Sequence, residues 1–201
     1  MRFSTSLRAV LAAAALILVL PAAQAQTTTI AAARTAGVGA TVTVQGVVSR
    51  AKGFLTQFQD ATGGLSIRQT SGGFFDAVTA GTIAPGTTIQ VTGVLSQFRG
   101  LLQINQGTTN DLTAFTIVGQ GAAPAAQTVT LAQLAASGED FESELVVVRN
   151  VSTTSTGTFA AATNVPITDP TSSTNAVVLR IANAGDTDVD GTPIPAGPFS
   201  V

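Results

Sequence analysis

The sequence predicts an all-β protein, and three stretches between Thr41 and Ile104 support this prediction. They are Val42–Val48, Phe54–Arg68 and Thr88–Leu95, which are rich in Val, Ile, Thr and Phe and alternate apolar with polar residues. A period of two places the apolar side chains on one face of a strand, whereas a helix needs a period near 3.6. Glycines punctuate these stretches, as is typical of strands joined by tight turns.

The composition is that of a folded domain and argues against several kinds of chemistry. Hydrophobic residues make up 45% of the chain and charged residues only 10%, which is not the composition of a disordered chain. Cysteine is absent, which excludes disulfides, thiolate metal sites and thiol catalysis. Histidine is also absent, so the commonest acid-base group at neutral pH is missing. We therefore expect a protein that is not an enzyme and needs no cofactor.

The N-terminus has the pattern of a secretory signal peptide. Two arginines precede the apolar run Ala9–Leu20, which is followed by the small-residue site Ala23-Gln24-Ala25. A membrane anchor is the alternative, but the run is about a dozen residues long and a spanning helix needs ~20. We expect residues 1–25 to be removed, so that the mature chain starts at Gln26, has no membrane span and is secreted or periplasmic.

The rest of the first half divides into elements that can be placed in order. The strongest local prediction is a hairpin at Phe54–Gln69, because Asp60–Gly64 supplies the residues that a tight turn needs. Gly46, inside the first strand, is expected to mark a bulge. The expected elements are a helical turn at Ile30–Arg34, a strand at Ala40–Arg50, the hairpin at Phe54–Gln69, a helical element at Phe75–Ala80, and strands at Thr87–Leu95, Leu101–Asn105 and Ala114–Val118. Alternation predicts a core of Val42, Val44, Val47, Phe58, Ile67, Ile89, Val91 and Ile104.

This order of elements is that of an oligonucleotide/oligosaccharide-binding (OB) barrel. The Val-x-Val-x-Gly-x-Val strand at Val42, the hairpin at Phe58–Ile67 and the segment Pro85–Phe98 resemble the OB-like domains of bacterial secreted proteins. Such domains commonly sit beside extracellular nuclease or phosphoesterase domains. The resemblance implies a five-stranded antiparallel barrel over residues 26–119 and an accessory role in a nuclease-type protein.

An internal repeat extends this prediction to the second half. Four blocks of the first half recur in order, beginning with Leu145–Ser152, which answers to Val42–Ser49, and ending with Thr192–Val201, which answers to Thr82–Val91. Thr130–Leu134 is a helix candidate that corresponds to the segment around Ile30. We expect a linker at 120–127 and a second OB-like copy at 128–201 that lacks its last strands. Either the chain belongs to a longer protein with linked downstream domains, or the second barrel is left unclosed with a free strand edge.

Charge is divided unevenly between the two copies. Residues 26–127 carry five basic and three acidic side chains, a net charge of +2. From Thr128 onward there are two basic and eight acidic side chains, a net charge of −6. Only the first copy is therefore suited to a polyanion, and its small net charge predicts weak binding.

The candidate ligand surface is the face of the second and third strands with the loops that flank it. The basic side chains there are candidates for phosphate contacts, and the two phenylalanines for stacking on bases or sugar rings. The alternative is that the phenylalanines fill the core and the cations are ordinary surface charges. The ligand classes are single-stranded nucleic acid and oligosaccharide, and the absence of Tyr and Trp disfavours the second. The candidate nucleic-acid-binding residues are Arg50, Lys52, Phe54, Arg68, Phe98 and Arg99.

A second constellation is the acidic run Asp186-Thr187-Asp188-Val189-Asp190-Gly191. It matches the first half of a calcium loop, in which alternate carboxylates converge on one cation. The position where a bidentate glutamate belongs is Gly197, and no flanking helices are indicated. A looser calcium-binding turn formed by Asp186, Asp188 and Asp190 and a plain acidic surface loop are the two alternatives, and the second is favoured.

Three classes of function are compatible with these patterns. The first is a secreted, non-catalytic OB-type binding or accessory module that binds single-stranded nucleic acid weakly. The second is a structural or adhesive spacer domain of an extracellular surface protein. An enzyme is the least favoured class, because histidine and cysteine are missing.

Overall fold

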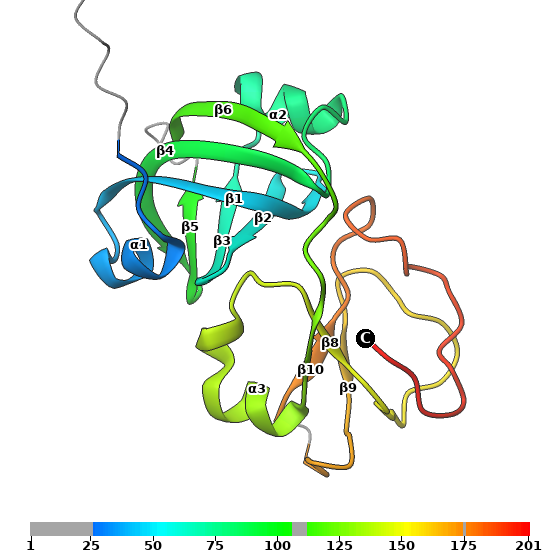
Figure 1. Ribbon diagram of the computed structural model, residues 1–201. Coiled ribbons are helices and arrows are strands. Elements are labelled where there is room, and N and C mark those ends of the chain that lie inside the picture. The colour runs from blue at the N-terminus through cyan, green and yellow to red at the C-terminus, as the bar shows by residue number, and fades with distance from the viewer. Residues whose placement is uncertain (1–25, 106–111, 175) are drawn as a thin grey trace, which may run out of the picture.

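The computed structural model describes residues 26–105, 112–174 and 176–201, and Figure 1 shows their arrangement. The predicted signal peptide, residues 1–25, lies outside the described residues. Within the described ranges, no helix is both long and apolar enough to cross a membrane. The chain has two parts, which we call the barrel (residues 26–120) and the C-terminal half (residues 127–201).

The barrel contains the five predicted strands and closes on itself. Its strand order is β1-β2-β3-β5-β4, and β1 also pairs with β4, which completes the ring. The pairings are antiparallel except that between β3 and β5, which is parallel. The fold is therefore an OB-like barrel. The strands are β1 (Thr41–Lys52), β2 (Leu55–Asp60), β3 (Gly63–Arg68), β4 (Thr87–Phe98) and β5 (Leu101–Asn105), and β6 (Leu112–Gln120) adds to the edge of β4.

Two short helices pack against the barrel. The first, α1 (Ile30–Ala36), buries Ile30 and Ala33. Its N-terminus is held by the β2–β3 turn, because Asp60 Oδ2 accepts the N–H of Ile30 at 2.9 Å. The second, α2 (Gly72–Thr79), lies between β3 and β4 and buries Phe74 and Val78. Both elements were predicted, and both are slightly longer than or offset from the predicted ranges.

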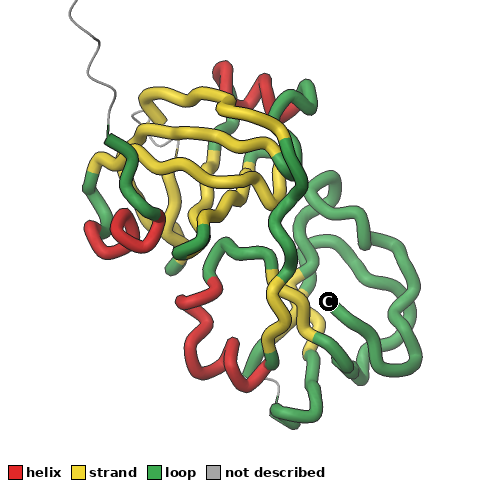
Figure 2. The backbone as a smooth tube through the Cα atoms, viewed as in Figure 1, coloured by secondary structure: helices red, strands yellow, loops and turns green. Residues whose placement is uncertain are grey.

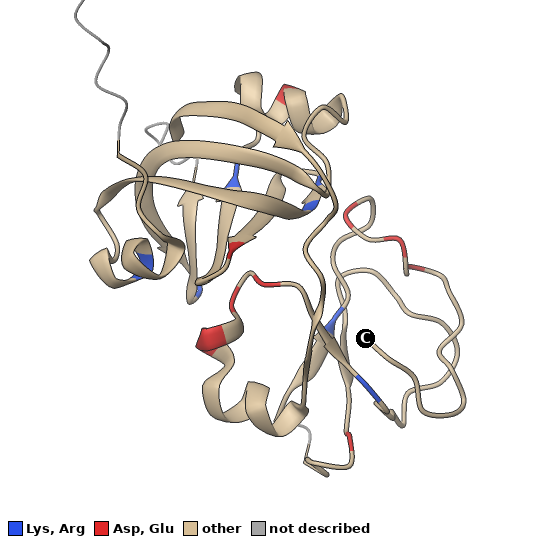
Figure 3. Cartoon of the chain, in the orientation of Figure 1, with Lys and Arg blue, Asp and Glu red and all other residues tan. Residues whose placement is uncertain are grey.

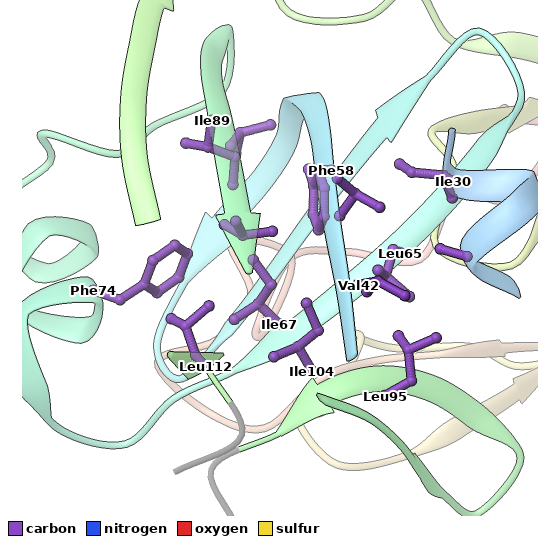
Figure 4. Close-up of a cluster of buried hydrophobic side chains, with 14 of the residues drawn as sticks. Ile30, Val42, Phe58, Leu65, Ile67, Phe74, Ile89, Leu95, Ile104 and Leu112 are labelled. Carbon is purple, nitrogen blue, oxygen red and sulfur yellow. The ribbon is translucent and has the colours of Figure 1, made fainter. Parts of the chain in front are cut away.

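The core is formed by alternate residues of the strands, and Figure 4 shows them converging inside the barrel. Seven of the eight predicted core residues are buried, and the exception is Val47, which is half-buried. In β1 the buried positions are Val42, Val44, Gly46 and Val48. Every second residue therefore continues to face the core on both sides of the glycine. A Cβ on Gly46 would lie 2.8 Å from Cδ2 of Phe58. Gly46 is therefore needed for close packing rather than for a bulge.

The bulge in β1 lies further along the strand than was predicted. The register with β2 shifts between Val48 and Arg50, which leaves Ser49 as the extra residue. One extra residue shifts by one which positions of the strand face inward, so that Arg50 and Lys52 do not enter the core. The position of this bulge therefore determines where two of the predicted cations lie.

The C-terminal half has little regular structure, and Figure 2 shows it mostly as loops. It nevertheless has its own core, which includes Leu131, Val148, Val151 and Ile167. Thr130 caps α3 with a capping box, in the region where a short helix was predicted. The elements are β7 (Gln127–Val129), α3 (Leu131–Ser137), a 3-10 helix (Gly138–Phe141), β8 (Val146–Val148), β9 (Asn164–Pro166) and β10 (Val178–Arg180).

Candidate ligand-binding face of the barrel

The outer side of β2 and β3 is the face predicted to bind a ligand. Phe58, Leu65 and Ile67 belong to the core. Because side chains alternate along a strand, their neighbours Gln59 and Ser66 lie on the outer side. This gives the face a polar surface in the middle and places cations at its ends.

The middle of this face is covered by residues 142–145 of the C-terminal half. Ser143 Oγ lies 2.8 Å from Ser66 Oγ in a buried pair, and Gln59 Oε1 accepts the N–H of Leu145 at 2.8 Å. A Cβ on Gly64 would lie 2.5 Å from the carbonyl carbon of Ser143. Only a glycine lets the two backbones approach this closely. The covering segment is therefore built into the fold, and β3 is buried on both sides.

Arg34 fixes the end of this covering segment. Its Nη1 donates to Glu142 Oε1 at 3.2 Å and to the carbonyl of Gly64 at 3.2 Å. The same Glu142 oxygen accepts the N–H of Leu102 on β5 at 2.9 Å. Burial raises the pKa of nearby Glu144, and the charge of Arg34 partly offsets that rise. Arg34 was not among the predicted site residues, and no pattern around it in the sequence indicates its role.

A second contact between the two parts involves the β1–β2 turn and the acidic run. Arg50 Nη2 donates to the carbonyl oxygen of Asp186 at 2.8 Å, and Lys52 forms an ion pair with Asp188. Gly53 has φ +60°, and the Asp186 carboxylate occupies the space that a Cβ on Gly53 would fill. Figure 3 shows the acidic positions of this loop beside the basic end of the barrel. Two predicted cations are thus already in contact with carboxylate-bearing residues of the same chain.

Phe54 and Arg68 form an aromatic-cation pair next to this turn. The guanidinium carbon of Arg68 lies 4.7 Å from the centre of the Phe54 ring, and Phe54 is 37% exposed. Arg68 pairs with Leu55, which in turn pairs with Lys52, so these residues lie on three neighbouring strand ends. We call Arg50, Lys52, Phe54 and Arg68 the hairpin patch.

Phe98 and Arg99 lie away from the hairpin patch. Arg99 stacks on Phe98 at 5.3 Å, and Phe98 is 57% exposed. Phe98 pairs with Leu101 at the start of β5, whereas Arg68 pairs with Asn105 at its end. Four residues of strand separate the two positions by about 13 Å. The structure therefore brings four of the six predicted residues together and leaves Phe98 and Arg99 beside the other end of β5.

The three aspartates of the predicted calcium turn make separate contacts. Asp188 pairs with Lys52, and Asp190 Oδ1 accepts the N–H of Ala161 at 2.7 Å. Asp186 faces Gly53. In the part of the chain that the structure describes, no three acidic side chains are grouped so that they could hold a metal ion. The geometry gives this loop a place in the contact between the two parts and lends no support to a calcium site.

A large hollow lies elsewhere, on the outer face of β1, β4 and β6. It has a volume of about 900 Å³, and uncharged side chains line it, among them Thr43, Gln45, Gln90, Thr92 and Phe115. Amide and hydroxyl groups of this kind suit neutral polyhydroxylated ligands better than phosphates. This face was not among the surfaces predicted from the sequence, although the alternating Thr and Gln residues of β1 and β4 indicate a solvent-facing surface.

Comparisons with known proteins add little to this geometry. No protein-family model and no curated protein matches the chain. Among solved structures, the hypothetical protein ygiW from E. coli matches 46% of this chain and 90% of its own, with 19% identity and a TM-score of 0.35. A putative aspartyl-tRNA synthetase from Leishmania major Friedlin matches 64% of this chain and 30% of its own, with 13% identity and a TM-score of 0.37. Likenesses at this level carry no argument about ligand or activity.

Proposed function

We propose that this protein is a non-catalytic OB-type binding module whose hairpin patch binds single-stranded nucleic acid weakly. The observation that carries the proposal is the half-exposed Phe54 ring with Arg68 stacked on it at 4.7 Å, beside Arg50 and Lys52. An aromatic ring offers a base a stacking surface, and three neighbouring cations offer phosphate contacts. In OB barrels the loop between the first two strands is one of the places where oligonucleotides bind.

Weak affinity follows from what already surrounds the patch. Arg50 and Lys52 contact Asp186 and Asp188, so a nucleic acid must displace or share these contacts. The covered middle of the β2–β3 face leaves room for few nucleotides. With about three phosphate contacts and one stacked base, we expect a dissociation constant in the micromolar range or weaker and a shallow dependence on salt.

Fluorescence anisotropy of a labelled deoxythymidine 12-mer at several salt concentrations tests the proposal. Phe54→Ala should weaken binding about five- to 150-fold, because one stacked base is worth ~1 to 3 kcal/mol. Phe98→Ala is the matched control, since Phe98 is also exposed and also stacked by an arginine but lies outside the patch. Asp188→Asn should strengthen binding, because it removes a competing carboxylate next to Lys52.

Equal effects of the two phenylalanine substitutions would contradict the location of the site. Absence of binding at millimolar protein and low salt would contradict the function itself. That second outcome would favour the structural or adhesive spacer. The specific observation behind the spacer is that residues 142–145 occupy the middle of the ligand face and join the two parts.

We also propose that the protein acts outside the cytoplasm as an accessory part of a nuclease-type protein. The support for export is the signal-peptide pattern at residues 1–25, and the support for the accessory role is the resemblance of the barrel motifs to such domains. N-terminal sequencing of the protein recovered from the expressing cells should give Gln26 as the first residue. A retained Met1 would contradict export with cleavage.

A further inference from the structure

The hollow on the outer face of β1, β4 and β6 has a floor of two cross-strand pairs. Figure 1 shows these three strands as neighbours in the barrel wall. Thr43 of β1 lies opposite Thr92 of β4, and Gln45 lies opposite Gln90. All four side chains face outward, because the residues next to them along each strand belong to the core. The floor therefore consists of amide and hydroxyl groups that the core of the barrel does not use.

The floor is bordered on both sides. On one side, residues 26–28 run along β1, because the N–H of Thr28 donates to the carbonyl of Thr43 at 2.8 Å. On the other side, β6 pairs with β4 and places Ala114 and Thr116 next to the floor. The hollow between these borders has a volume of about 900 Å³. Ligand pockets of proteins typically have volumes of ~300 to 1,000 Å³, so this hollow is large enough for a ligand.

The hollow carries no charge. Among the described residues, no charged side chain lines it. β4 and β6 contain no charged residue along their whole length, and the two cations of β1 lie at the end of that strand, beyond the floor (Figure 3). A phosphate or carboxylate that leaves water needs cations or charge-assisted hydrogen bonds in exchange. The hollow is therefore suited to an uncharged ligand, in contrast to the hairpin patch.

The two glutamines of the floor have hydrogen-bonding groups to spare. In the part of the chain that the structure describes, neither the Gln45 amide nor the Gln90 amide bonds to another protein group. Thr43 and Thr92 bond to each other, with their hydroxyl oxygens 2.9 Å apart. A glutamine amide offers a carbonyl acceptor and two N–H donors side by side. Two neighbouring hydroxyl groups of a sugar can bind such an amide with one donated and one accepted hydrogen bond.

A polypeptide is a less suitable occupant of this floor. Peptide segments that bind to a sheet do so mainly through main-chain hydrogen bonds at an open strand edge. β4 has β1 on one edge and β6 on the other, so its main-chain groups are already paired over the floor. Only side chains are available to a ligand there. Ala114 and Val118, which is 52% exposed, add apolar contact for the C–H groups of a sugar ring.

We propose that this hollow binds a short stretch of a neutral polysaccharide. We call the site the neutral face, and it consists of Thr43, Gln45, Gln90, Thr92, Ala114 and Thr116. The glutamine pair and the threonine pair lie two residues apart along their strands, about 7 Å, so a ligand needs at least two sugar rings to contact both. The site lies on a different face from the hairpin patch and does not depend on the function proposed for that patch.

The binding should be weak and independent of salt. The chain has no Tyr or Trp that could stack on a sugar ring, so the affinity must come from hydrogen bonds. Each such bond contributes little, because it replaces a bond to water. We therefore expect a dissociation constant in the millimolar range. Because no charges take part, the constant should be the same at about 50 mM and about 500 mM sodium chloride.

NMR titration of the full chain tests the proposal. The probes are three neutral oligosaccharides, cellotetraose, maltotetraose and chitotetraose, which differ in linkage and in the acetamido group. We expect at least one of them to shift the side-chain amide signals of Gln45 and Gln90, and the comparison of the three identifies the type of polysaccharide. Tetragalacturonate, which carries carboxylates, is the control ligand. It should bind more weakly, because no cation lines the hollow.

Variants locate the site. Gln90→Ala should weaken binding of the neutral probe about two- to tenfold, the effect of one net hydrogen bond. Gln45→Ala should do the same from the neighbouring strand. Gln97→Ala is the matched control, because Gln97 is also an exposed glutamine of β4 but does not line the hollow. Each variant is first checked for an unchanged backbone amide spectrum.

Three outcomes would overturn the proposal. Without a shift of either glutamine amide at several millimolar of each neutral probe, the face is an ordinary solvated strand surface. Equal weakening by Gln97→Ala and Gln90→Ala would place any binding elsewhere. Tighter, salt-dependent binding of tetragalacturonate would contradict a neutral ligand. None of these measurements involves nucleic acid, so their failure is distinct from a failure of the function proposed for the hairpin patch.

Discussion

The barrel and the C-terminal half start from the same local contacts and reach different degrees of order. In both, an Asp-x-Thr turn holds the first residue of a short helix. In the barrel, β1 and β4 each run for 12 residues, whereas no strand among the described residues of the C-terminal half exceeds three residues. The comparison teaches that this turn defines how each part begins. The long strands distinguish the closed barrel from the loop-rich C-terminal half.

The core of the C-terminal half is also smaller than that of the barrel. Of the residues that the structure describes, 17 are buried in the barrel core and eight in the core of the C-terminal half. Burial of apolar surface is the main source of stability, so the C-terminal half should be the weaker of the two and should depend on its contacts with the barrel.

The largest effect is expected where the two parts touch most closely. Gly64→Ala places a Cβ 2.5 Å from the backbone of Ser143, which must move. We expect a loss of about 1 to 3 kcal/mol in the free energy of unfolding, since overpacking at a rigid contact costs this much. Urea unfolding followed by circular dichroism measures it.

Gly63→Ala is the matched control for this substitution. A Cβ on Gly63 would have Cγ2 of Ile30 as its nearest neighbour, at an ordinary 3.5 Å. The two glycines are adjacent in β3, so both substitutions change strand propensity alike. If Gly63→Ala costs as much as Gly64→Ala, the contact with Ser143 is not the cause, and the C-terminal half does not depend on it.

A smaller effect is expected at the shared turn. Asp60→Ala removes the acceptor for the N–H of Ile30 and should cost about 0.5 to 2 kcal/mol, the usual range for a helix cap. Asp169→Ala should release α3 and leave the barrel unchanged. Hydrogen exchange of the amides of Ile30 and Leu131 separates the two cases. Loss of protection at both amides in either variant would contradict the separate roles of the two turns.

The smallest effect concerns pH. Burial acts to raise the pKa of Asp169, but hydrogen bonds from Thr171, Leu131 and Ser172 outweigh it and hold that pKa below its usual value. The stability that this carboxylate contributes is therefore present above its unfolded pKa, ~3.9, and is lost as the pH falls through the lower folded value. The difference in stability between the protein and Asp169→Asn should shrink over that window.

Glu144 should behave in the opposite way. Its raised pKa means that the folded chain favours the protonated form, so Glu144→Gln should gain stability relative to the protein as the pH rises through the raised value. Unfolding of both variants between pH 2 and pH 7 checks the two signs. Parallel curves for Asp169→Asn and Glu144→Gln would contradict the environments described here.

The sequence predicted the elements well because their signals are local. The Val-Thr alternation of Val42–Val48 and the turn Asp60–Gly64 each fix a strand or a hairpin without reference to distant residues. Which residues of β1 face the core was predicted less well. The strand keeps its alternation through Gly46, where the Phe58 ring leaves no room for a Cβ, and it bulges at Ser49 instead. That packing depends on another strand and is not visible in the local pattern.

The candidate site was only partly predictable for the same reason. The residues of the hairpin patch were found, because cations and aromatics near a turn are visible in the sequence. The cover over Ser66 and the role of Arg34 were missed, since their partners lie in the other half of the chain. The parallel pairing of β3 and β5 was likewise missed, because it follows from closure of the whole barrel.

The position of β4 has a consequence for the order in which the chain folds. β4 pairs with β1, β5 and β6, and its pairing with β1 joins segments far apart in the chain, such as Thr41 and Val94. The β2–β3 hairpin needs only its own turn and can form early, whereas β1 must wait for β4 to close the ring. Non-local pairings of this kind slow folding. The rate-limiting step should therefore be the arrival of β4, and a growing chain would hold β1 unpaired on that side until β4 had been synthesised.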